Sequence, residues 1–220
     1  MRRPGRAAHC LHPEPTVIRF LELLCRGLRA VTNRTCLAAG WALIALSVVI
    51  SLNVIARKIF SFSLQGVDEY GGYCLAICAS IGFSQAAYDR AHIRISVLTD
   101  LLPSRLRACS DVLALALLTS VAVTLAVKAS GVAYESYSMQ ALATSALRTP
   151  LAIPQAMWAA ALCWFGLVLA TQLLHSLLLL VRRDWGGINR NYGNPSVDEE
   201  VAEELRSANE RMAGKLEGAR

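Results

Sequence analysis

Charged side chains that could pair with one another lie on either side of a short link in this 220-residue sequence. Arg57 and Lys58 end one apolar stretch, and Asp68 and Glu69 begin the next. Because a link this short makes the flanking helices antiparallel neighbours, Arg57 can reach Glu69, and such an ion pair would fix the rotation of one helix against the other. The alternative, in which all four are ordinary solvated flank charges, fits the pattern equally well.

Residues that could support catalysis or bind a metal do not gather anywhere along the chain. Of the four histidines only His175 lies in an apolar run, so a bis-histidine haem site lacks its pairs of ligands. Cys74 and Cys78 share a helix face, but no further ligand stands near them, and packing as small apolar residues is favoured. There is no HExxH motif and no phosphate-binding glycine loop. We therefore expect no catalytic residue, no metal site and no cofactor.

The composition is that of a membrane protein. The chain is 55% hydrophobic and only 17% charged, whereas a soluble domain carries about a quarter charged residues. Its mean hydropathy is +0.42, and the apolar residues form long blocks. The net charge of +6 would suit a nucleic-acid partner, but the arginines flank apolar blocks, where membrane topology and lipid headgroups account for them. We expect binding to membrane lipids and none to nucleic acid.

Four apolar runs are long enough to cross a bilayer, and they cover residues 36–56, 70–88, 111–134 and 153–181. The second run is rich in Gly, Ala, Ser and Cys, which let helices approach closely in lipid, so it should be buried against other helices. The third is dominated by Leu, Val and Ala and should face lipid more. Pro154 suits the first turn of the last helix, and Gln155 follows it.

Polar segments surround these runs. Residues 1–15 should be disordered, and 16–34 form a basic amphipathic helix that lies in the membrane interface or packs on a soluble partner. His92 and Arg94 start a second interfacial segment and would contact headgroups or a partner's loop. Ser196 and Glu199 form a capping box before a short acidic helix. The predicted fold is thus an all-α membrane protein with four transmembrane helices plus amphipathic interfacial helices, divided into residues 1–34, 35–181 and 182–220.

The distribution of basic residues predicts the orientation. One side of the membrane would hold the arginines of the amino-terminal flank, of the link between spans two and three, and of the carboxy-terminal flank: Arg19, Arg26, Arg29, Arg34, Arg90, Arg94, Arg105, Arg107, Arg182, Arg183 and Arg190. The other side has only Arg57, Lys58 and Arg148. By the positive-inside rule both termini lie in the cytoplasm.

The order of several residues resembles a known family. They are Asn53, Arg57, Lys58, Phe60, Ser63 and Glu69, then Gly82 and Ala86, then His92, Ile93, Arg94, Leu98, Leu102 and Pro103, and finally Pro150, Ile153, Pro154 and Gln155. This order is similar to the small, DctQ-type membrane subunit of tripartite ATP-independent periplasmic (TRAP) transporters over residues 35–181. The chain departs from the family pattern at Lys58, Asp68 and Ser96.

The resemblance implies a scaffold in the bacterial inner membrane rather than a carrier. Such a subunit pairs with a large, DctM-type permease that holds the substrate and sodium sites, while a periplasmic, DctP-type solute-binding protein delivers organic acids such as dicarboxylates. The residues expected to be structural or to form interfaces are Arg57, Asp68, Glu69, His92, Arg94, Pro154 and Gln155. Alternatives are the small subunit of a tricarboxylate tripartite transporter, a membrane-anchor or assembly subunit of a respiratory complex, and a small membrane-embedded enzyme.

Overall fold

The computed structural model describes residues 16–61, 66–89, 103–145, 147–183, 185–187, 205–209 and 212. Within these ranges four long helices make up the fold: α1 (Thr16–Phe60), α2 (Val67–Tyr88), α4 (Ser104–Ser138) and α5 (Ala152–Val181). An isolated bridge between Leu142 and Pro150 is the only β-type pairing in the described residues. The predicted all-helical class is confirmed.

The first helix differs from the prediction. We expected an interfacial helix over residues 16–34 and a separate span from residue 36, but α1 is a single helix of 45 residues. Residues 28–39 contain neither glycine nor proline, so nothing in the sequence stops the helix there. The hydroxyl of Thr35 donates to the carbonyls of Val31 and Thr32, at 3.1 and 3.0 Å, and stays within the helix. At 1.5 Å per residue α1 is about 68 Å long.

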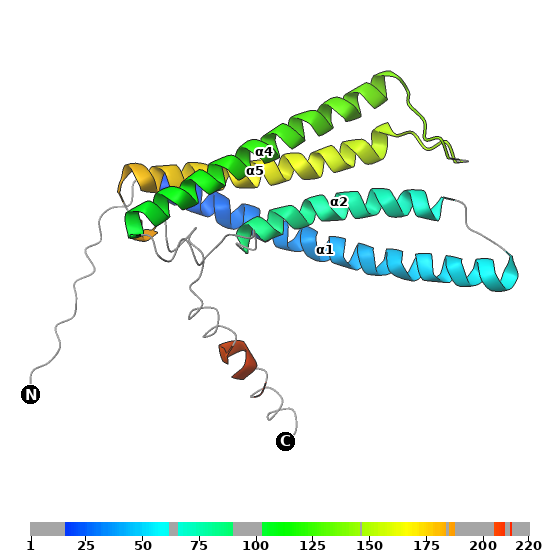
Figure 1. The fold of residues 1–220 in the computed structure, drawn as a ribbon, viewed down its shortest axis with the longest axis horizontal. Helices are drawn as coiled ribbons and strands as arrows, with labels where there is room; N and C mark the ends of the chain where they lie inside the picture. The colour runs from blue at the N-terminus through cyan, green and yellow to red at the C-terminus, as the bar shows by residue number, and fades with distance from the viewer. Residues whose placement is uncertain are drawn as a thin grey trace, which may run out of the picture.

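The helices form two antiparallel hairpins, α1 with α2 and α4 with α5 (Figure 1). Helix α5 is central, because it contacts α1, α2 and α4. The hairpins lie together near the start of α1 and the end of α5, and they diverge toward the two links that join their own helices (Figure 1). We call these the terminus end and the link end of the bundle.

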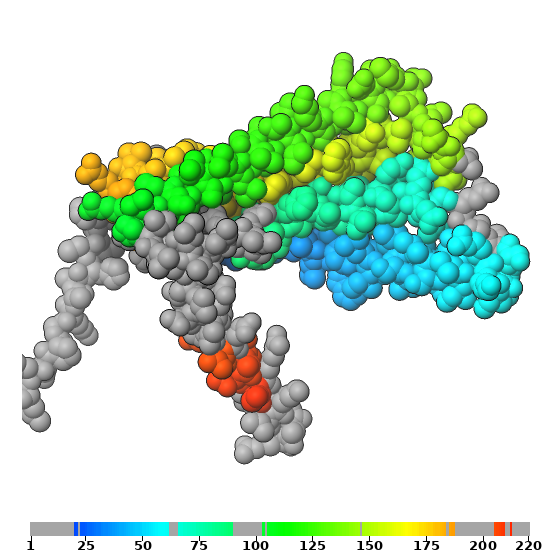
Figure 2. Space-filling view, in the orientation of Figure 1, coloured from blue at the N-terminus to red at the C-terminus, as the bar shows by residue number. Residues whose placement is uncertain are grey.

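A row of alanines forms the seam between α4 and α5. Ala122, Ala126 and Ala129 recur at helical spacing and are at most 8% exposed. They pack on Leu162, Phe165 and Leu169 of α5 together with other buried residues. Small side chains let the two backbones approach, and α4 crosses in front of α5, which stays visible on either side of it (Figure 2). Leucines and valines lie on the exposed face of α4, where they would meet lipid: Leu113, Leu117, Val121 and Val127.

In the part of the chain that the structure describes, three helices are long and apolar enough to cross a membrane: Leu23–Phe60, Arg105–Ser138 and Ala152–Val181. Helix α2 is not among them; it carries Asp68 and Glu69 in its first turn and Gln85 near its end. It packs between α1 and α5, as its small residues predicted, with Gly71, Cys78, Ser80 and Ser84 buried.

Candidate functional site

Glu69 lies in a polar cluster at the link end of the bundle. The hydroxyl of Tyr73 donates to Glu69 Oε1 at 2.9 Å. Glu69 Oε2, Ser145 Oγ and Thr149 Oγ1 are all fully buried, and none makes a hydrogen bond of good geometry in the described part of the chain. The hydroxyl of Ser145 nevertheless holds the pKa of Glu69 below its usual value of 4.5, with smaller contributions from Tyr73 and Thr149 and against the opposing effect of burial. Glu69 is therefore a carboxylate at neutral pH. We call these four residues the link-end cluster.

The α4–α5 loop is shaped to present its hydroxyls to Glu69. The amide of Ala143 donates to the carbonyl of Thr149 at 2.9 Å, and the amide of Leu151 donates to that of Ala141 at 3.0 Å. These bonds close the loop around Ser145. The loop then rests on the start of α2, where Leu147 lies against Gly66, a residue with φ +88°. Gly66 and Glu69 thus hold the second hairpin to the first.

Of the two alternatives for the charges beside the first link, the structure favours the solvated flank charge for Arg57 over an ion pair with Glu69. Both residues are described and no ion pair joins them: Arg57 is exposed, and Glu69 faces hydroxyls. Asp68 is exposed in the first turn of α2, where a negative charge is favourable to the helix dipole.

The other predicted residues have mixed outcomes. Pro154 lies in the first turn of α5, as expected. The Gln155 side chain has its Oε1 buried without a hydrogen-bond partner in the described residues. His92 and Arg94 lie outside the described residues.

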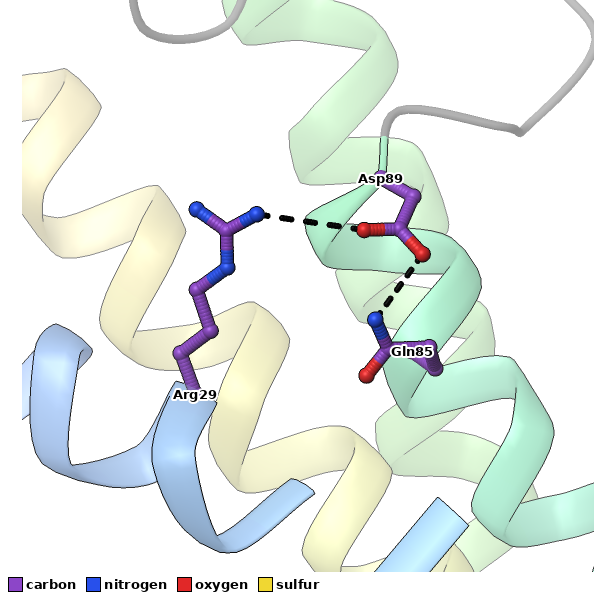
Figure 3. Close-up of polar contacts among 3 residues, drawn as sticks. All are labelled: Arg29, Gln85 and Asp89. Carbon is purple, nitrogen blue, oxygen red and sulfur yellow. Dashed lines mark hydrogen bonds and ion pairs between the residues drawn. The ribbon is translucent and has the colours of Figure 1, made fainter. Parts of the chain in front are cut away.

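A second polar cluster connects α1 with α2 at the terminus end of the bundle. Arg29 Nη2 of α1 lies 3.9 Å from Asp89 Oδ1 at the end of α2, and Gln85 Nε2 donates to Asp89 Oδ2 at 2.9 Å (Figure 3). The Arg29 guanidinium also lies 6.0 Å from the ring centre of Tyr88, whose hydroxyl donates to the carbonyl of Cys25 at 3.5 Å. Both charges are about half exposed, so the ion pair contributes at most about 1 kcal/mol and mainly sets position.

One hydrogen bond ties α1 directly to the central helix. Trp164 Nε1 of α5 donates to Thr32 Oγ1 at 3.1 Å, and Thr32 is fully buried. About two helix turns further along α1, Cys78 Sγ of α2 contacts the carbonyl of Ala39 at 3.6 Å. The amphipathic half of α1 is thus packed on both α2 and α5, which explains why it continues the helix instead of turning away.

Replacing Trp164 with phenylalanine should lower the thermal unfolding temperature of the detergent-solubilised protein. The change leaves the buried Thr32 hydroxyl without its partner, which costs about 1–3 kcal/mol. The matched control is Trp158→Phe, which alters a partly buried tryptophan of the same helix. An equal effect of both changes would show that the Trp164 bond does not hold α1 in place.

Sequence reasoning missed a set of buried polar residues in the α4–α5 half of the bundle. Asp111 is only 3% exposed, although the sequence placed it at the first residue of the third predicted span. Because α4 begins at Ser104, Asp111 lies in its second turn. The others share one face of α5: Thr171, Gln172, His175 and Ser176. A carboxylate and an imidazole inside apolar runs are the signal that could have found them, because such groups face neighbouring helices rather than lipid.

These features define a class of protein: an integral membrane protein whose polar residues hold helices together. Within the described residues no group of three or more side chains is placed to bind a metal ion. Residues 46–183 match the family model for the DctQ component of tripartite ATP-independent periplasmic transporters. Since this match covers more than half of the chain, the protein belongs to the DctQ family. This family is the small membrane component of TRAP transporters, which is a transporter component rather than an enzyme family. The resemblance seen in the sequence is therefore confirmed. No curated protein matches the chain.

Proposed function

We propose that this chain is the static scaffold of a TRAP-type importer of organic acids such as dicarboxylates. It would anchor a large, DctM-type permease in the bacterial inner membrane, and a DctP-type periplasmic solute-binding protein would deliver the substrate. A permease whose substrate domain moves across the bilayer needs a fixed partner, and a bundle tied at both ends supplies rigidity.

The observation that carries this proposal is the exposed apolar face of α1. Only 6% of the most apolar part of this helix is buried, against 50% in α5. The exposed residues follow a helical repeat and form one stripe: Leu37, Trp41, Ile44, Val48, Leu52, Ile55 and Ile59. The longest helix of the bundle therefore offers most of its apolar surface to something outside the chain.

We propose that all four helices span the membrane, with both termini in the cytoplasm. Residues 70–88 of helix α2, which follow the acidic pair of its first turn, are about 29 Å long at 1.5 Å per residue and match a hydrocarbon core of about 30 Å. Because α1 and α5 pack against it, part of its surface is shielded from lipid. The proposed division is a basic cytoplasmic arm to residue 34, a membrane domain over 35–181 and a cytoplasmic tail from 182. The link-end cluster would then face the periplasm.

Co-purification tests the scaffold function. The tagged chain is expressed together with the large permease encoded beside it and is isolated in mild detergent. Recovery of the permease in stoichiometric amounts is expected, and an unrelated tagged membrane protein should recover none. Isolation of the chain alone while the permease is present in the membrane would refute the proposal.

Replacing Glu69 with glutamine should lower recovery of this complex more than replacing Glu135 does. Glu69→Gln removes the charge that faces the loop hydroxyls, so the α4–α5 hairpin loses its tie to α2. Glu135 is an exposed carboxylate near the end of α4, at the same end of the bundle, and is the matched control. Equal recovery of the two variants would mean that Glu69 does not organise the surface used in assembly.

A further inference from the structure

An open groove runs along α1 at the terminus end of the bundle, beside the cluster of Arg29, Gln85 and Asp89. Its volume is about 700 Å³, and six residues of α1 between Asn33 and Ile44 line it together with Gln85 of α2. This size lies within the range of small-molecule sites in proteins. The groove belongs to none of the helix contacts described above.

The groove changes character along its length. Leu37, Trp41 and Ile44 make one part apolar, and Leu37 and Trp41 are 66% and 65% exposed, so a ligand can reach them. Asn33 and Gln85 make its other part polar. Gln85 Oε1 has no hydrogen-bond partner in the described residues, while its Nε2 is held by Asp89. In Figure 3 this oxygen points away from Asp89.

Two arginines lie on the same face of α1, beyond the polar end of the groove. Arg29 precedes Asn33 by four residues and Arg26 by seven, so both lie on the stripe that carries Leu37 and Ile44. Arg29 makes a single long contact with Asp89, at 3.9 Å, and is 57% exposed, which leaves other guanidinium donors available. Arg26 is exposed as well. The charge of Asp89 opposes an anion here, but two arginines outweigh it.

This order of groups matches one kind of ligand. A glycerophospholipid has acyl chains, hydroxyl or ester groups at the interface and a phosphate, in the order in which the groove offers apolar walls, amides and arginines. We propose that the groove binds an anionic phospholipid, with an acyl chain along Leu37, Trp41 and Ile44 and the phosphate toward Arg29 and Arg26. Basic pockets between membrane helices bind such headgroups in this way. All residues of the site belong to this chain, and its apolar wall is the first part of the exposed α1 stripe, so the lipid would occupy Leu37 to Ile44 and leave Val48 to Ile59 for the permease.

Native mass spectrometry of the full chain in detergent tests the site. The probes are phosphatidylglycerol and phosphatidylcholine with identical acyl chains. Preferential retention of phosphatidylglycerol is expected, and Arg29→Gln should reduce that preference about fivefold. Arg182→Gln, which removes an exposed arginine at the end of α5, is the matched control and should leave the preference unchanged. Equal retention of both lipids by the unaltered chain would overturn the proposal.

Filling the groove provides an independent test. Gly40 lines it, and no atom lies within 4 Å of where a Cβ would stand, so Gly40→Leu occupies the space without a clash. We expect it to lower retention of both lipids at least fivefold, whereas Gly72→Leu, at an equally open glycine of α2, should not. Helical circular dichroism checks folding, and Trp41→Ala, at an exposed position, serves as a second groove variant. Unchanged lipid retention with loss of the co-purified permease would assign the groove to the permease instead and refute a lipid site.

Discussion

Replacing Ala122 with leucine is expected to destabilise the helix bundle more than any exposed substitution does. Ala122 is fully buried in the seam between α4 and α5, where it packs with Phe165 and Leu169. A leucine there has no room, so either the helices separate or the neighbours leave their preferred rotamers, which costs about 1–3 kcal/mol. The measurement is the thermal unfolding temperature in detergent, followed by circular dichroism.

The control for this change is Ala170→Leu, at an exposed position of α5. Both substitutions exchange alanine for leucine inside a long helix and so have the same small effect on helix propensity. Ala170→Leu should leave the unfolding temperature unchanged. If the two variants unfold together, the alanine seam does not hold α4 against α5.

Replacing Gly66 with valine is expected to detach the α4–α5 loop from the start of α2. The φ of +88° at Gly66 is one that a β-branched residue rarely adopts, at a cost of about 1–3 kcal/mol. Any Cβ at this position would also meet the side chain of Leu147. We expect a lower unfolding temperature together with faster hydrogen exchange at the amides of Ala143 and Leu151, whose bonds close the loop.

Two further variants separate the causes. Gly72→Val changes a glycine inside α2 that has open space around it. Hydrogen exchange at the loop amides should be unchanged or slower in this variant. Leu147→Ala, combined with Gly66→Val, removes the contact and retains only the backbone strain. If the loop amides of the double variant exchange as slowly as in the unaltered chain, the faster exchange in Gly66→Val is due to the contact with Leu147. If hydrogen exchange is unchanged in Gly66→Val itself, the loop is not docked on α2.

The helical architecture could be predicted from the sequence because it depends on local properties. Runs of apolar residues, the small residues of α2 and the position of Pro154 each indicate an element without knowledge of its neighbours. The predicted boundaries of the helices were less accurate. Nothing in residues 28–39 marks a junction, so α1 continues through it, and α4 begins before the apolar run does, which places Asp111 inside the helix.

The partners of the site residues could not be predicted in the same way. Proximity along the chain favoured Arg57 for Glu69, but the α4–α5 loop, more than seventy residues further on, supplies the hydroxyls that act on its carboxylate.

The sequence by itself thus determined a helical membrane protein, its apolar runs and its family. The tertiary structure alone decided which polar groups meet, such as Thr32 with Trp164 across 132 residues and Glu69 with Ser145. The physical reason is that a contact between helices depends on how each is rotated and shifted against its neighbour. Rotation and register come from packing along whole faces, such as the alanine seam, and no single stretch of sequence encodes them.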